Sequence, residues 1–150
     1  MSAAHYTDTL NALIETCRDG EHGFNACATH AQASQLKTLF RERADAYRSA
    51  AERLQNVVSR SGVEPDASGS VSGALHRGWV SLRSTLPGDD NLAMLNEAER
   101  AEDRALTRYR DALSQSLPAD IRLMVEHQLR AARQSYDRIR LLRDQYRAIA

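Results

Sequence analysis

The sequence predicts an all-α fold, a bundle of four long helices arranged as two antiparallel hairpins. Four stretches repeat apolar residues three and four positions apart, which is the period of an amphipathic helix. Turn residues separate these stretches, and the central connection is much longer than the other two. The chain has 150 residues, 42% of them hydrophobic and 27% charged, so we expect one domain spanning residues 1–150.

The first two helices should form a hairpin. The first is expected over about Thr7–Ala31, where Thr7 or Asp8 can cap its start. The second should run from Ser34 to about Ser61. Their apolar stripes are Leu10, Leu13, Ile14, Cys17, Phe24 and Ala28 in the first, and Leu36, Leu39, Phe40, Tyr47, Ala51, Leu54, Val57 and Val58 in the second. Because only a few residues separate the two helices, they should lie antiparallel.

The central connection, about residues 62–90, should carry the chain along the whole bundle. Residues 59–73 are rich in serine, glycine and other turn formers and show no helical period. Farther along, Leu75, Trp79 and Leu82 can form one apolar edge of a short helix. A connection this long lets the second and third long helices run parallel, which is the ferritin-like arrangement and differs from a plain up-down-up-down bundle.

The second hairpin should follow this connection. The third long helix is expected to start near Asn91 with Asp90 as its cap, and Pro118 suits the first turn of the fourth helix. The fourth helix should continue almost to the carboxyl terminus. The apolar stripes are Leu92, Leu95, Leu106, Tyr109 and Leu113 in the third helix, and Ile121, Met124, Val125, Ala132, Ile139, Leu142 and Tyr146 in the fourth.

Polar residues interrupt the apolar stripe of every helix. At a rise of 1.5 Å per residue, Glu21 and Glu102 come out at nearly the same height in the bundle, with Arg43 and Gln128 close to them. A buried charge is costly unless it is paired or bound to metal, so this layer is the candidate site. Its members are Glu21, Arg43, Tyr47, Glu99, Glu102, Asp103, Gln128, Ser135 and Tyr136.

Two interpretations of this polar layer stay open. In the first, Arg43 pairs with two or more of the carboxylates Glu21, Glu99 and Glu102, and the network is completed by Tyr47, Gln128 and Tyr136. In the second, Glu21, Glu99 and Glu102, with Asp103 or Gln128, form an all-oxygen site for a divalent metal such as iron, manganese or zinc. Three carboxylates against one arginine leave an excess negative charge that a cation or a shared proton can neutralise.

The histidines argue against a standard dinuclear centre. Di-iron carboxylate bundles supply a Glu-x-x-His motif from each of two helices, and this chain has no such motif on any predicted helix. Ferroxidase chemistry is therefore not expected. The metal interpretation rests on carboxylate and amide oxygens alone.

Composition and charge narrow the classes of partner. Twenty basic and twenty acidic residues give a net charge of zero, which argues against a general nucleic-acid binder. No apolar run approaches the ~20 residues that a membrane span needs, and the amino terminus does not read as a signal peptide. Together with two cysteines spaced too far apart to bridge, this predicts a cytoplasmic protein. The arginine-rich fourth helix can be a basic edge for an acidic partner or RNA, or a solvated face with local ion pairs.

Three segments together resemble a known family. They are Asp19-Gly20-Glu21-His22-Gly23-Phe24, the stretch from Gly69 to Trp79 that ends in Leu-His-Arg-Gly-Trp, and Glu97-x-Glu99-Arg100-x-Glu102-Asp103. The chain resembles a bacterial family of ferritin-like four-helix bundles of unassigned function, the domain-of-unknown-function family 2383. The resemblance covers nearly the whole chain. It implies the bundle topology and no established activity.

These observations lead to two functional hypotheses. The favoured one is a cytoplasmic, non-enzymatic bundle that acts as a structural or interaction protein, as a homo-oligomer or with a protein partner; a role in stress physiology is an association from the fold alone. The alternative is a metal-binding or redox protein that uses the inner carboxylates, with Glu99 and Glu102 as its main residues.

Overall fold

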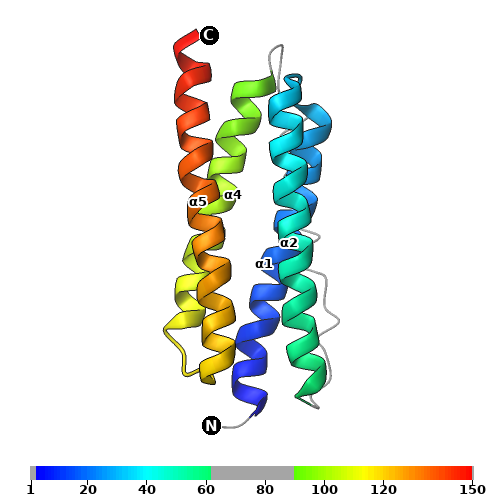
Figure 1. Cartoon of the computed structure of the whole chain (residues 1–150), viewed down its shortest axis with the longest axis vertical. Coiled ribbons are helices and arrows are strands. Elements are labelled where there is room, and N and C mark those ends of the chain that lie inside the picture. The colour runs from blue at the N-terminus through cyan, green and yellow to red at the C-terminus, as the bar shows by residue number, and fades with distance from the viewer. Residues whose placement is uncertain (1–2, 62–89, 150) are drawn as a thin grey trace.

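The computed structural model describes residues 3–61 and 90–149, which form four α-helices packed as one bundle (Figure 1). The helices are α1 (Ala3–His30), α2 (Ser34–Arg60), α4 (Asp90–Leu113) and α5 (Ala119–Ile149). The predicted all-α four-helix bundle is confirmed. None of the described helices is long and apolar enough to cross a membrane.

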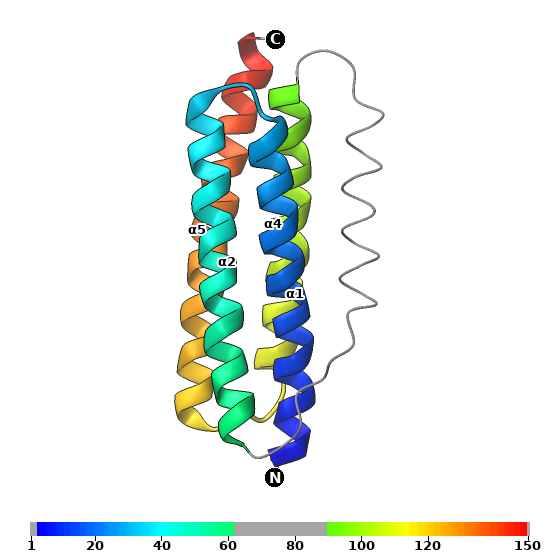
Figure 2. The ribbon, with the colours of Figure 1, turned by 90° about the vertical axis from the view of Figure 1, so that its right-hand side faces the viewer.

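The helix directions follow the order predicted from the long central connection. α1 and α2 are antiparallel, as are α4 and α5, while α2 and α4 run the same way (Figures 1 and 2). The two chain ends consequently lie at opposite ends of the bundle. The short helix predicted around Leu75, Trp79 and Leu82 lies outside the described residues.

Four helix pairs are neighbours across the bundle. α1 packs against α2 and α4, and α5 packs against α4 and α2. The α2 and α5 pair packs less closely than the other three. This uneven packing leaves one seam of the bundle more open than the rest.

The helix ends show how the two hairpins are joined. α1 begins at Ala3, so Thr7 lies inside the helix, where its side chain is fully buried instead of capping the start. Ala33, the residue before α2, provides no side-chain cap. Instead, Oδ1 of Asn91 accepts hydrogen bonds from the backbone N–H groups of Gln32 (2.8 Å) and Ala33 (3.1 Å). An amide at the start of α4 thus satisfies two backbone donors of the loop between α1 and α2.

The core follows the predicted apolar stripes. Leu10, Leu36, Leu95 and Ile139, one residue from each helix, have no more than a trace of exposed surface. Five stripe residues predicted to lie inside are only partly buried, namely Ile14, Leu92, Leu113, Met124 and Tyr146. The stripes therefore pack inward, and three of the polar residues that interrupt them, Glu102, Gln128 and Ser135, are buried with them.

Candidate functional site

The centre of the bundle holds a buried ion pair. Glu102 on α4 is fully buried, and Arg43 on α2 donates to both of its carboxylate oxygens, from Nε to Oε2 at 2.9 Å and from Nη2 to Oε1 at 3.4 Å. The hydroxyl of Tyr47, one turn along α2 from Arg43, also donates to Oε1 of Glu102. The guanidinium carbon of Arg43 lies 4.9 Å from the centre of the Tyr47 ring. Glu102 therefore accepts hydrogen bonds from two nitrogens of the Arg43 guanidinium and from the Tyr47 hydroxyl.

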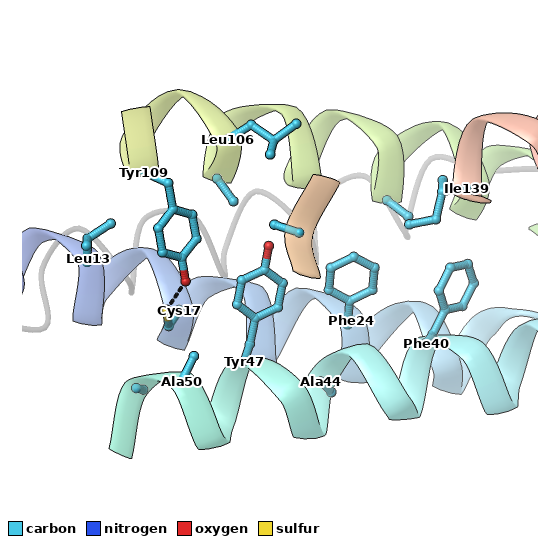
Figure 3. Packing of buried hydrophobic residues seen from close by; sticks show 14 of the residues in the cluster. Leu13, Cys17, Phe24, Phe40, Ala44, Tyr47, Ala50, Leu106, Tyr109 and Ile139 are labelled. Carbon is cyan, nitrogen blue, oxygen red and sulfur yellow. Dashed lines mark hydrogen bonds between the residues drawn. The ribbon is translucent and has the colours of Figure 1, made fainter. Parts of the chain in front are cut away.

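A second polar chain lies beside this pair and links all four helices. The Tyr109 hydroxyl on α4 donates to Oε1 of Gln128 on α5 at 2.9 Å, and Nε2 of Gln128 donates to the carbonyl of Ala50 on α2 at 3.4 Å. Sγ of Cys17 on α1 lies 3.3 Å from the Tyr109 oxygen (Figure 3). Because the Tyr109 proton goes to Gln128, the thiol is the donor to Tyr109. The chain fixes the relative positions of the helices in the core.

Tyr47 reaches Glu102 because α1 carries a glycine beneath its ring. A Cβ atom at Gly20 would lie 2.7 Å from Cδ2 of Tyr47, closer than a real contact allows. Phe24 stacks on the same ring at a centroid distance of 5.9 Å, and Figure 3 shows the Tyr47 and Phe24 side chains pointing into the interior from α2 and α1. Glycine costs about 1 kcal/mol in a helix interior relative to alanine, and here it provides the space that the phenol occupies.

The protonation states follow from burial and from the pairing. Burial raises the pKa of Tyr47 well above its ordinary value of 10.0, and the Glu102 carboxylate raises it further. Burial alone would lower the pKa of Arg43, but the attraction of Glu102 outweighs it, so the Arg43 pKa is raised. Near neutral pH the layer therefore holds a neutral phenol and a charged guanidinium.

Both cysteines are buried and unreactive. Burial raises the pKa of Cys17 from 9.0 to about 12 and raises that of Cys27 well above 9.0. The Cys17 and Cys27 thiols are free and stay protonated at neutral pH. Because the thiolate is the nucleophile and the metal ligand, neither residue is suited to nucleophilic or redox chemistry.

The other predicted carboxylates do not join Glu102. Glu99 pairs with Arg143 on α5, with Arg140 at 3.6 Å, and Glu21 pairs with Arg18 on its own helix at 2.9 Å. Both carboxylates sit at the edge of the core, with 19% and 20% of their side chains exposed. Within residues 3–61 and 90–149, no three histidine, cysteine, aspartate or glutamate side chains are grouped so that they could hold a metal ion.

Arg43 consequently pairs with one carboxylate in the described part of the chain, not with two or more as the first interpretation expected. The reason is distance from the axis: Glu21 and Glu99 lie at the borders of their stripes, where Arg18 and Arg143 reach them. Asp103 is exposed.

The α5 members of the predicted layer have different surroundings. Gln128 is buried and belongs to the Tyr109 chain. Ser135 is also buried, and its Oγ has no hydrogen-bond partner among the described residues. Tyr136 is only half-buried, and its ring is covered by the guanidinium groups of Arg140 at 5.5 Å and Arg133 at 5.9 Å. Tyr136 therefore contributes to the rim of α5.

Sequence reasoning missed three members of the interior network. Cys17 and Tyr109 were assigned to the apolar core, and Gly20 was not singled out as a packing residue. Two signals were available in the sequence. A tyrosine within an apolar stripe needs a partner for its hydroxyl when it is buried, and a glycine within a helical period often marks a close approach of another side chain.

Comparison with known proteins identifies a family for this chain but gives no activity. The family model described as "Domain of unknown function (DUF2383)" matches residues 5–115. This range includes Arg43, Tyr47, Glu102 and Tyr109, and it ends before α5 begins. No curated protein matches the chain.

Proposed function

We propose that this chain is a non-enzymatic helical domain that acts by binding a protein partner. The chain belongs to the DUF2383 family of domains of unknown function. The proposal includes a ferritin-like connectivity, which the common direction of α2 and α4 supports. It also includes a cytoplasmic location, which two free buried cysteines support.

The observation that carries the non-enzymatic part of this proposal is that each of three carboxylates predicted to lie inside pairs with its own arginine. Glu102 has Arg43, Glu99 has Arg143 and Glu21 has Arg18. The excess negative charge that would attract a cation is therefore compensated by side chains. This favours a structural network over an all-oxygen metal site.

The outer face of α5 is the surface we assign to the partner. It comprises Leu123, Arg130, Gln134, Arg138 and Leu141. The two leucines are 63% and 60% exposed and lie about five helical turns apart, hence on the same side of the helix. Arg130 and Arg138 form no ion pair within the described residues. Exposed leucines among unpaired arginines suit an acidic protein surface with apolar contacts.

A metal titration tests the compensated network. The metal-free protein and its Glu102→Gln and Glu99→Gln variants are titrated with iron, manganese and zinc by calorimetry. We expect no stoichiometric binding to any of the three proteins. One-to-one binding by the natural chain that is lost in Glu102→Gln would overturn this proposal and establish the metal-binding alternative.

Site-specific crosslinking tests the partner surface. A photo-crosslinking residue replaces Gln134, within the outer face of α5, or Asp45, which is exposed on α2. We expect the first probe to label one polypeptide in cells, the second to fail, and the label to disappear in an Arg130→Glu, Arg138→Glu variant. Equal labelling from both positions, or labelling that survives the charge reversal, would contradict the assignment.

A further inference from the structure

The most open seam of the bundle contains a hollow of about 210 Å³ between α2 and α5. Three alanines line it, Ala46 and Ala50 on α2 and Ala131 on α5. Their methyl groups are too short to fill the space between these two helices, which pack less closely than the other neighbouring pairs. We call this hollow the α2–α5 groove.

The polar lining of the groove is basic. Arg43 and Arg53 face it from α2 and His127 faces it from α5, and no carboxylate is among its lining residues. Arg53 has no ion pair among the described residues, unlike Arg43. Because Glu102 already balances the charge of Arg43, Arg53 supplies the uncompensated positive charge of the lining, beside an imidazole and the free N–H groups of Arg43.

The guanidinium group of Arg43, in this lining, is already held in position to donate hydrogen bonds. Its Nε and Nη2 atoms each donate once to Glu102, which fixes the plane of the guanidinium group. A guanidinium carries five N–H groups, so Glu102 does not use all of them. Gln128, also in the lining, has one amide N–H left after its bond to Ala50. These donors are held in place before any ligand arrives.

A second, shallower hollow of about 340 Å³ also lies between α2 and α5 and shares Arg53 with the groove. Its lining adds Asn56, Ser59 and Arg60 of α2 and Met124 of α5, again without a carboxylate. Arg53 and Arg60 are two helical turns apart and so lie on one side of α2. The absence of acidic groups thus extends along the described lining of the seam.

We propose that the α2–α5 groove binds a small organic anion with a single carboxylate or phosphate group, held by Arg43, Arg53 and His127. The apolar body of the anion would lie against the alanines. The volume is below the roughly 300–1,000 Å³ of pockets for drug-sized ligands, so the ligand is small. His127 of the groove adjoins the outer face of α5, but the proposed site does not depend on a protein partner.

Amide NMR titration tests the site on the full chain. Butyrate and inorganic phosphate serve as probes, at an ionic strength held constant with chloride so that screening does not change. We expect saturable shifts confined to α2 near residues 43–53 and α5 near residues 127–131. The tighter of the two probes identifies the oxyanion as carboxylate or phosphate.

Matched arginine variants complete the test. Arg53→Ala should weaken binding about tenfold, the loss of roughly one charged hydrogen bond. Arg41→Ala removes an exposed arginine of α2 that does not line the groove, and the affinity should stay unchanged. Shifts that do not saturate, or equal losses in both variants, would overturn the proposal, since Arg53 and Arg41 are exposed and neither change should prevent folding.

Discussion

Two glutamates on the same helix, Glu99 and Glu102, have different surroundings although both interrupt the apolar stripe of α4. Glu102 is fully buried and bound by Arg43 and Tyr47. Glu99 keeps 19% of its side chain exposed and pairs with Arg143 at the rim. Three residues along a helix thus separate an interior ion pair from a rim pair.

This difference shows that the contribution of an ion pair to stability depends on its burial as well as on the pairing itself. A partly exposed pair is screened by water and salt, so it contributes less than a pair whose carboxylate is fully buried. A buried carboxylate has lost its hydration, so removing its charge leaves the partner guanidinium uncompensated. We therefore expect the stability of the bundle to depend on Glu102 far more than on Glu99.

The largest expected effect is that of Glu102→Gln. It should lower the free energy of unfolding by about 3–5 kcal/mol, because Arg43 is left charged in the interior. Glu99→Gln is the matched change on the same helix and should cost clearly less, because water reaches the rim pair. Urea unfolding followed by circular dichroism measures both. Equal costs for the two variants would remove the distinction between interior and rim.

The next effect is that of Tyr47→Phe. It removes the hydroxyl that donates to Glu102 and keeps the ring, and it should cost about 1.5–3 kcal/mol, typical of a hydrogen bond to a charged group. Tyr136→Phe is the rim control, since the Tyr136 ring is half-buried beside two arginines. We expect its unfolding free energy to stay within about 0.5 kcal/mol of the natural protein. A smaller loss for Tyr47→Phe than for Tyr136→Phe would contradict the geometry.

Alkaline pH should lower the free energy of unfolding through the cysteines and tyrosines buried in the interior. The pKa values of Cys17, Cys27, Tyr47 and Tyr109 are all raised by burial in the folded state. Their contribution to stability is complete below the ordinary values of 9.0 for cysteine and 10.0 for tyrosine, and it is lost as pH rises toward the folded-state values. Each group adds a slope of about 1.4 kcal/mol per pH unit.

Unfolding under reducing conditions between pH 8 and 11 measures this loss. Between pH 9 and 10 the two thiols dominate, so Cys17→Ala should reduce the slope by about half and leave the share of Cys27. A stability that stays flat up to pH 10.5 would show that these groups are not buried as described.

The smallest effect is that of Gly20→Ala. Alanine gains about 1 kcal/mol of helix propensity, but its Cβ meets the Tyr47 ring and should cost about 1–3 kcal/mol, giving a net loss of about 1 kcal/mol. In a Tyr47→Ala background, which removes the Cγ and ring atoms that the Cβ would meet, the same change should become stabilising. A stabilising effect of Gly20→Ala in the natural chain would show that the ring does not rest on α1.

The fold and part of the site could be predicted from the sequence. The helical period placed Leu10, Leu36, Leu95 and Ile139 in the core, and the long central connection predicted that α2 and α4 run parallel. The same period placed Glu102 inside. These inferences succeed because they depend on direction around a helix axis, which a spacing of 3.6 residues determines.

Neither the depth at which each glutamate is buried nor the arginine with which it pairs could be predicted in this way. Glu21, Glu99 and Glu102 all interrupt an apolar stripe, yet one is buried and two reach the rim. Which arginine meets which carboxylate depends on side-chain reach between helices. The sequence therefore overestimated the charge around Arg43, and it missed the hydrogen bond from Cys17 to Tyr109 because both were assigned to apolar packing.

The most direct test of the account is a double-mutant cycle on the buried pair, with Arg43→Met and Glu102→Leu made singly and together. If the layer is a structural ion pair, each single variant should lose about 3–5 kcal/mol of unfolding free energy. The double variant should then recover most of that loss, because no unpaired charge remains. Additive losses in the double variant would contradict the account, since they would mean that Arg43 and Glu102 do not compensate each other.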